Sequence, residues 1–587
     1  FHYPAAQQWK GAKGVADLTV ETKDRTGPDR RASIWTLVAM LAIFAATILP
    51  YLLLPLNPHY DERRYSIGAA QMIESGDYVA PRTHKDELRL LKPPLTYYYL
   101  VAGFRLFGEN QFAAKAAMAA SALAIVALTY ALGLGLGAGR LAALLGAAMV
   151  GGHRVFFTTA SQHLPDMPLI LGTTTALVGA VHVLRAGRTP AWAWYALFLG
   201  AAFGVLAKGM LPLMLLAVFA ACLALPAHAA PGPAASGGAR PTGGTGHVWA
   251  AAALGLAAAA SWFVAVYLRH PDALLAQFLD DQVSGKASFG PLTVLAGLRK
   301  PVTDLTLSFL PGAAAIALAW RQRDRTRPWQ PDRAFWMVAG WCVATLLVFA
   351  FSRHLYERYT LPAAPAFAAL CAVAASRIPV DALAGGLRLS SRFFLAVAAA
   401  TGLAGAVVAG LLGHAGLALI ALAATLAVAV LLWRISASAL GGIVAIMAVA
   451  PLFDVAQVPV HASLVFPTDG QIAAGFDARK PMPPGGLRLV LDDGRLVDHV
   501  GLATGDIVRT GYAEAFDPAE HAAVKRVYFK NESHIPALEA AGFEVMQARF
   551  LRGLKLDGGD IRALLRSRDR NTLLAKDGRT FYIAARP

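Results

Sequence analysis

Long uninterrupted runs of apolar residues recur along most of this chain, and they constrain its fold more than any other feature. Of the 587 residues, 56% are hydrophobic and only 15% are charged. Runs of about 17–25 apolar residues have the length that a helix needs to cross a bilayer. We therefore expect an α-helical polytopic membrane protein with about thirteen transmembrane helices. The formal net charge of +16 then indicates cytoplasmic loops and membrane lipids as partners, not nucleic acid.

The positions of Arg and Lys between the runs predict the side of the membrane that each loop occupies. Positively charged loops stay in the cytoplasm, so Arg30 and Arg31 place residues 1–33 inside, and the first run leads outward. Later Arg-rich turns then fall inside as well. Four segments come out on the far side, and we expect them to converge on one cavity. They are residues 57–111, 161–167, 269–302 and 352–359.

Two further features predict how the chain is organised outside the membrane. The run 95–107 is short for a span and carries Arg105, so we expect an interfacial helix there. After the predicted transmembrane domain, 34–456, the composition becomes that of a soluble protein, and 457–587 is predicted to be a small α/β domain on the outer side. Its expected elements are strands at 487–491, 524–529 and 580–584 and a helix at 535–541.

A charged cluster, Asp61-Glu62-Arg63-Arg64-Tyr65, follows the first apolar run on the predicted outer face. Ionisable groups at a membrane boundary are costly to desolvate, and they usually mark a functional site. Asp61 has a structural alternative, because an Asp at this place can cap a helix by accepting a backbone N–H. The charges that follow it could likewise form a solvated interfacial face. The cluster alone leaves both interpretations open.

Other charged residues on the same predicted side strengthen the functional interpretation. Lys92 precedes Pro93-Pro94, which holds the chain extended and presents the ammonium at a fixed place, as suits a phosphate. Asp166, between Pro165 and Pro168, is a second carboxylate, again with a helix cap as its alternative. Further candidates for the walls of the site are Lys208, Arg353, Arg358, Tyr359, Tyr65, Tyr97 and Tyr98.

A site on the outer side receives no cytosolic ATP or nucleotide sugar, and the sequence shows no glycine-rich phosphate loop. The energy for a reaction there must arrive in a lipid-borne group. A sugar linked to a polyprenyl phosphate fits, because Lys and Arg can stabilise the charge that develops on the leaving phosphate. A carboxylate such as Asp61 can act as a general base or orient the acceptor.

Several ordered motifs resemble the membrane glycosyltransferases of the protein O-mannosyltransferase superfamily, which have the GT-C fold, and among these the bacterial aminoarabinose transferases that modify lipid A. The resemblance spans residues 34–456. The motifs are Asp61-Glu62-Arg63-Arg64-Tyr65, Ser75-Gly76-Asp77, Lys92-Pro93-Pro94-Leu95-Thr96-Tyr97-Tyr98, Phe107-Gly108, Pro165-Asp166-Met167-Pro168, Ala207-Lys208-Gly209 and Tyr359-Thr360-Leu361-Pro362.

The resemblance implies a monomeric, inverting glycosyltransferase of the bacterial inner membrane. It would move aminoarabinose or a related amino sugar from undecaprenyl phosphate to a lipid A phosphate at the periplasmic face, and so confer resistance to polymyxin and other cationic peptides. By the same resemblance, Asp61 and Asp166 are the catalytic carboxylates. The resemblance also makes Lys92 the lysine that contacts the carrier phosphate, and Lys208 and Tyr359 supporting wall residues. Together with the charge pattern, we expect phosphate contacts from Lys92, Arg63, Arg64 and Lys208, and substrate contacts from Glu62, Tyr65, Tyr97, Tyr98, Arg353, Arg358 and Tyr359.

One position departs from the pattern. Leu91 stands where the aminoarabinose transferases usually have Glu before the lysine, so a divalent metal and recognition of the amino group at this position stay open. Asp86 and Glu87 could supply the charge instead, or form a solvated loop tip. Two other functions also remain: a related transferase that acts on a protein or an envelope polysaccharide, and a lipid-linked sugar transporter.

Overall fold

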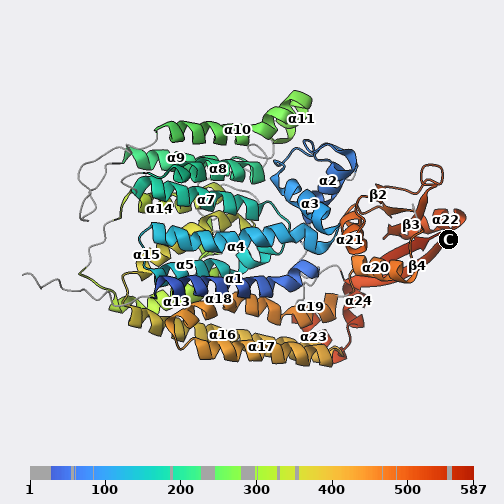
Figure 1. The fold of residues 1–587 in the computed structure, drawn as a ribbon. Coiled ribbons are helices and arrows are strands. Elements are labelled where there is room, and N and C mark those ends of the chain that lie inside the picture. The colour runs from blue at the N-terminus through green and yellow to red at the C-terminus, as the bar shows by residue number, and fades with distance from the viewer. Residues whose placement is uncertain are drawn as a thin grey trace, which may run out of the picture.

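The computed structural model describes residues 28–586 with internal gaps, and it is mostly helical, as predicted (Figure 1). The gaps are residues 55–58, 60, 84, 186–188, 226–244, 279–297, 300–301, 304, 327–330, 351–355, 466, 484–485 and 552–557.

Ten helices within the described ranges are long and apolar enough to cross a membrane, which confirms a multi-pass membrane protein. They are α1 (Arg30–Leu53), α4 (Gln111–Gly135), α7 (Asp166–Arg185), α8 (Ala191–Lys208), α10 (Thr245–Arg269), α14 (Arg333–Ala350), η3 (Glu357–Ala363) continued by α15 (Ala364–Ala375), α16 (Val380–Leu411), α17 (Ala415–Ile435) and α18 (Ala439–Ala456).

A bent pair, α5 (Arg140–Gly151) and α6 (Arg154–Ala160), is apolar enough to form either a broken eleventh span or a re-entrant loop. Shorter apolar helices are α9 (Leu211–Ala224) and α13 (Leu310–Ala319). The number of thirteen transmembrane helices stays a prediction.

Residues 140–160 do not form one straight helix, because α5 and α6 meet at an angle of 61°. Gly152 lies at the break, where a Cβ would stand only 2.9 Å from the carbonyl oxygen of Ile446 on α18. His153 restarts the helix, since its Nδ1 accepts the backbone N–H of Phe156 at 3.2 Å. The kink brings the end of α6 directly to the outer segment 161–167.

The first outer segment contains two short helices, α2 (Glu62–Ser75) and α3 (Leu95–Phe107), and α3 has the bounds expected for the interfacial helix. Gly76 and Gly108 end these helices with φ of 70° and 77°, a conformation that glycine adopts at low cost. Gly103 lets α3 approach α4, because a Cβ there would collide with the carbonyl of Ala113. The packing of α3 therefore fixes the outer segment on the membrane bundle.

The C-terminal region forms a five-stranded sheet in the order β2-β1-β3-β5-β4. β1 is parallel to β2 and β3, and β5 is antiparallel to β3 and β4. The strands are β1 (Leu487–Leu491), β2 (Thr510–Ala513), β3 (Val524–Phe529), β4 (Glu544–Leu551) and β5 (Gly578–Ala585). The helices around them are α20 (Asp469–Arg479), α21 (Arg495–Thr504), α22 (Ile535–Ala540), α23 (Gly558–Ser567) and α24 (Asn571–Asp577). The predicted α/β character is confirmed, but β2 and β4 were not predicted.

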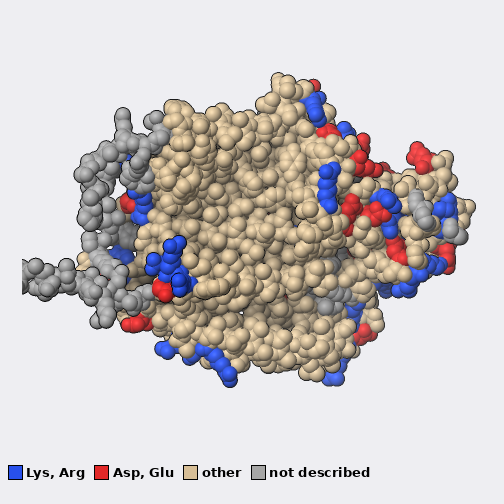
Figure 2. Space-filling view, viewed as in Figure 1, with Lys and Arg blue, Asp and Glu red and all other residues tan. Residues whose placement is uncertain are grey.

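The sheet domain packs against the first outer segment at one end of the bundle, beside α2 and α3 (Figure 1). Ile67 of α2 belongs to the buried apolar cluster of the sheet domain. Glu109 accepts the backbone N–H of Val508 at 3.1 Å, and Lys85 lies 2.5 Å from Glu514. Figure 2 shows the charged side chains gathered at the two ends of an otherwise uncharged body, as expected for a bundle embedded in lipid.

Candidate active site

Residues from four separate elements meet at the end of the bundle that carries α2. Asp61 immediately precedes α2, Asp166 is the first residue of α7, Lys208 is the last residue of α8, and Arg358 lies on η3. The start of the third outer segment also reaches this region, since Gln277 accepts the backbone N–H of Leu90 at 2.8 Å. Among the described residues, the four predicted outer segments therefore come together at this end of the bundle.

Asp61 occupies the N-cap position of α2, but its side chain makes no capping hydrogen bond. One carboxylate oxygen lies 3.0 Å from Arg64, and the other lies 3.4 Å from Arg358. The structure thus uses this carboxylate in ion pairs and not as the helix cap that the sequence left open.

Asp166 is almost completely buried, with 1% of its surface exposed. A buried carboxylate is strongly unfavourable without opposite charge, and two cations supply it. Lys208 Nζ lies 2.5 Å from Oδ1, and Arg358 Nε lies 3.3 Å from Oδ2. Asp166 is therefore held in one position by residues from two other elements.

Arg358 connects the two candidate catalytic carboxylates, because Nη2 faces Asp61 while Nε faces Asp166. Its guanidinium carbon stands 4.5 Å from the ring centroid of Tyr356 and 5.6 Å from that of Tyr359. Lys208 Nζ stands 4.3 Å from the ring centroid of Tyr359. The aromatic faces stabilise both cations where they meet the carboxylates.

His59 also belongs to this cluster, although no sequence pattern selected it. Its Nε2 lies 2.8 Å from Nη1 of Arg358, and its Nδ1 lies 3.1 Å from the backbone nitrogen of Asp61. Burial and then the charge of Arg358 lower the pKa of His59, which favours a neutral ring at neutral pH. A second overlooked residue, Arg89, donates from Nε to the hydroxyl of Tyr97 at 3.1 Å.

The predicted tyrosines differ in their placement. Tyr65 and Tyr97 are buried, with ring centroids 5.2 Å apart, and both contact Arg89. Tyr98 is more exposed and donates its hydroxyl to the backbone of Tyr78 at 2.9 Å. Tyr98 therefore contacts Tyr78 while Tyr97 contacts Arg89, because adjacent side chains of a helix point in different directions.

The predicted phosphate contacts also occupy different places. Lys92 and Arg63 are half-buried in the first outer segment, and Arg64 is mostly exposed beside Asp61. Arg353 lies outside the described residues. Glu62, predicted to contact substrate, is 2% exposed and faces His163 instead of a surface.

Asp86 and Glu87, the acidic residues that precede Leu91 in the described hairpin, are both exposed. Asp86 adopts a φ of 61° at the tip, where its side chain is 79% exposed and pairs with Arg82 at 3.4 Å. Of the two alternatives, a substitute for the missing Glu or a solvated loop tip, the position of Asp86 matches the loop tip. Within the described ranges, no group of three or more His, Cys, Asp or Glu is arranged to hold a metal ion.

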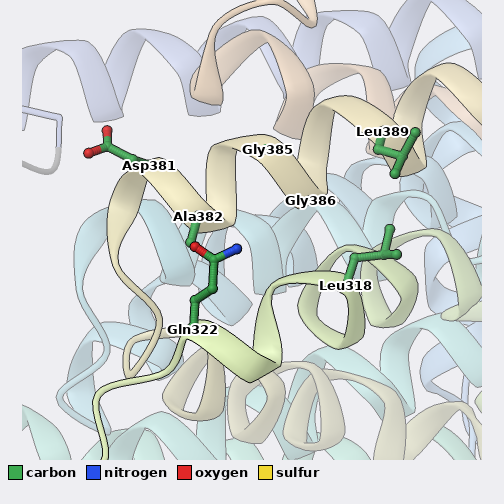
Figure 3. A pocket seen from close by; sticks show the side chains of 7 residues that line it. All are labelled: Leu318, Gln322, Asp381, Ala382, Gly385, Gly386 and Leu389. Atoms are coloured by element: carbon green, nitrogen blue, oxygen red, sulfur yellow. The ribbon is translucent and has the colours of Figure 1, made fainter.

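A pocket of about 360 Å³ lies elsewhere, between α13 with the following turn and the start of α16 (Figure 3). It contains none of the candidate residues and falls on the side predicted to be cytoplasmic. Its lining residues are Leu318, Gln322, Asp381, Ala382, Gly385, Gly386 and Leu389.

A family model described as dolichyl-phosphate-mannose-protein mannosyltransferase matches residues 33–233. The fold matches the crystal structure of ArnT from Cupriavidus metallidurans bound to undecaprenyl phosphate with a TM-score of 0.62 and 19% identity, covering 94% of this chain and 98% of that one. The chain therefore shares its fold with that structure.

In sequence, the chain is similar to bacterial aminoarabinose transferases. It is 28% identical over 366 residues to the undecaprenyl phosphate-alpha-4-amino-4-deoxy-L-arabinose arabinosyl transferase 1 of Sodalis glossinidius, covering 59% of each chain. It is 32% identical over 177 residues to the corresponding transferase of Pseudomonas savastanoi, covering 29% of this chain and 32% of that one. The chain thus matches the Sodalis protein over about three fifths of its length.

Proposed function

We propose that this protein is an inverting glycosyltransferase that moves aminoarabinose or a related amino sugar from undecaprenyl phosphate to a lipid A phosphate. The site would lie at the periplasmic face of the bacterial inner membrane. The observation that supports this most is the cluster in which Arg358 joins Asp61 and Asp166, with Lys208 beside them. Its position in a fold shared with ArnT, at the end predicted to face outward, suits a substrate that arrives in the lipid.

The reaction exchanges one bond at the anomeric carbon of the sugar. An oxygen of the acceptor phosphate forms a bond to this carbon while the bond to the carrier phosphate breaks. The electron pair of the broken bond stays on undecaprenyl phosphate, which leaves with an additional negative charge. Attack from the face opposite the leaving group inverts the configuration.

Cations that are already held in place can stabilise this developing charge at little cost in reorganisation. We assign contact with the carrier phosphate to Lys92, with Arg63, Arg64 and Lys208 as supporting cations. Lys208 is fixed by Asp166 and by the ring of Tyr359, so it need not be ordered when the donor enters. Asp166 would then act mainly by holding these cations.

Asp61 is the carboxylate that we place next to the acceptor. A phosphate acceptor is already ionised at neutral pH, so it needs orientation more than deprotonation. With 20% of its side chain exposed, Asp61 is more accessible than Asp166, at 2%. Asp61 could also accept a hydrogen bond from the amino group of the donor sugar. Leu91 cannot do so, because it has no carboxylate.

Capping a lipid A phosphate with an amino sugar removes negative charge from the membrane surface. Cationic peptides and polymyxin then bind less strongly, which gives the expected resistance. A second candidate acceptor is a protein or an envelope polysaccharide. It is favoured by the match of residues 33–233 to a family of protein mannosyltransferases.

Mass spectrometry of lipid A decides between these acceptors. The gene is expressed in a host whose own lipid A transferase has been deleted, and extracted lipid A is compared with that from cells carrying Asp61→Asn. A gain of one sugar mass with the wild-type protein alone supports the proposal. If lipid A is unchanged while a protein or polysaccharide fraction gains sugar, the acceptor assignment is wrong.

A further inference from the structure

Glu62 joins the two segments that carry the candidate carboxylates. Its Oε2 accepts the backbone N–H of His59 at 2.6 Å, and its Oε1 accepts the backbone N–H of His163 at 3.0 Å. His59 lies two residues before Asp61, and His163 lies three residues before Asp166. One side chain therefore spans residues that are about a hundred positions apart in the sequence, immediately beside both members of the site.

The imidazole of His163 adds a second connection between the same segments. Its Nδ1 lies 3.0 Å from Oε1 of Glu62, and its Nε2 lies 2.7 Å from Oγ of Ser66. Ser66 is one helical turn after Glu62 on α2, and its hydroxyl also lies 3.1 Å from the carbonyl oxygen of Glu62. The ring thus links the segment before α7 to two successive turns of α2.

This Ser66–His163–Glu62 arrangement has the connectivity of a hydrolase triad, but its burial argues against that role. Ser66, His163 and Glu62 are 0%, 1% and 2% exposed. A nucleophile must reach its substrate, whereas this hydroxyl is enclosed between α2 and the segment before α7. The same burial makes the arrangement well suited to hold two segments at a fixed separation.

The surroundings keep Glu62 ionised, which strengthens its hydrogen bonds. Burial alone would raise the pKa of this carboxyl, but His163, Lys115 and the N–H of His59 outweigh burial and lower the pKa to about 2. Lys115 is itself 1% exposed and donates to the carbonyl of Tyr51 at 3.1 Å. The end of α1, α2, α4 and the segment before α7 therefore share one buried polar network.

We propose that His163 and Glu62 are positioning residues that fix the separation of Asp61 and Asp166, and that neither touches the sugar or a phosphate. The proposal rests on the proposed function for its activity readout. Arg358 can pair with both carboxylates only while they stand on either side of one guanidinium. A shift of about 1 Å between reacting groups can lower a rate by about 100-fold.

The kinetic test uses His163→Ala and His163→Gln, with His414→Gln as a matched control at an exposed position before α17. Undecaprenyl phosphate in detergent micelles is the binding probe. For His163→Ala we expect kcat to fall by about 100-fold while the Kd of undecaprenyl phosphate changes by less than about threefold. His163→Gln should recover part of kcat, because its amide can still donate to Glu62. Wild-type kcat in His163→Ala, or a loss of binding as large as in Lys92→Ala, would overturn the proposal.

A structure of the His163→Ala protein, determined by electron cryomicroscopy, provides a test that does not depend on activity. We expect Arg358 to lose contact with Asp61 or with Asp166, whereas His414→Gln should keep both contacts. Arg358 bridging both carboxylates in His163→Ala would overturn positioning even if transfer is lost. If the wild-type protein transfers no sugar but the variant loses the bridge, the proposed function fails and the positioning role stands. Should His163→Ala not fold, Ser66→Ala removes the hydroxyl that contacts His163 Nε2 and the carbonyl of Glu62. We expect Arg358 to lose contact with Asp61 or with Asp166 in this variant too, and a bridge to both would overturn the proposal.

Discussion

Lys208 Nζ lies 2.5 Å from Oδ1 of Asp166, which brings the last residue of α8 against the first residue of α7. The carboxylate is buried and the ammonium is 17% exposed, so the pair has one enclosed partner and one that can reach a ligand. Such a pair can deliver a fixed cation to a phosphate while remaining electrically compensated.

Replacing Lys208 by Gln should slow transfer without unfolding the protein. Asp166 would keep Arg358 Nε at 3.3 Å, so its charge would stay partly compensated. We expect kcat to fall by about 10- to 100-fold, within the range for losing one electrostatic group. Transfer from purified donor is measured at saturating acceptor. Unchanged kcat in Lys208→Gln would exclude Lys208 from the site.

Arg358 should tolerate no replacement, including lysine. Only a guanidinium presents separate nitrogens to Asp61 and Asp166 at the same time. We expect Arg358→Gln to lower kcat by about 100- to 1,000-fold. The kcat of Arg358→Lys should exceed that of Arg358→Gln by less than about tenfold. Near wild-type kcat in Arg358→Lys would show that positive charge alone is sufficient and that the bridge is unimportant.

The Lys208–Asp166 pair also depends on the close packing of α7 against α8. A Cβ at Gly172 would stand 2.6 Å from the carbonyl oxygen of Gly200 and from the nitrogen of Gly204. Gly172→Ala should therefore destabilise the protein by roughly 1–3 kcal/mol and lower the thermal unfolding midpoint in detergent. Gly385→Ala on α16 is the matched control, because a Cβ there has no neighbour within 4 Å. Equal midpoints for the two variants would contradict this account of the packing.

The sheet domain should lose stability in alkaline solution through His499. Burial would lower the pKa of this imidazole, but Asp469, 3.1 Å away, outweighs burial and raises it to about 9. Because the pKa is raised in the folded protein, protonated His499 contributes its full stabilisation of the sheet domain below about pH 6.5. This stabilisation is lost as the pH rises through 9. Because His499 is partly exposed, the loss is on the order of 1 kcal/mol.

The measurement for this prediction is the denaturation midpoint of the sheet domain in the full chain, taken at pH 6.5 and pH 9.5. The wild-type midpoint should fall by more than that of His499→Asn. An identical fall in both proteins would show that other groups cause the pH dependence.

Local sequence signals predicted the helices and the central strands well. The helix at 95–107 has Pro93-Pro94 before it and Gly108 after it, and the observed α3 has the same bounds. The strands β1, β3 and β5 are buried in the middle of the sheet and carry apolar runs. The two strands that were missed, β2 and β4, lie at the sheet edges, where polar and charged residues interrupt the apolar pattern.

The site was only partly predictable, for a different reason. Asp61, Asp166, Lys208 and Arg358 could be selected because charge at a membrane boundary is costly wherever the chain folds. The roles of His59, Arg89 and His163 depend on partners that only the tertiary structure supplies. Glu62 shows the same limit, because its charge was visible in the sequence but its burial against His163 was not.

Transfer by purified Asp61→Asn protein in liposomes tests the central claim most directly. The assay supplies undecaprenyl phosphate-linked aminoarabinose and lipid A, and mass spectrometry measures the glycosylated lipid. The substitution keeps the shape of the side chain and removes the charge that faces Arg64 and Arg358. The account predicts that wild-type protein forms product and that Asp61→Asn forms at least about 100-fold less, with an unchanged unfolding midpoint. Product formation by Asp61→Asn at the wild-type rate would contradict the account.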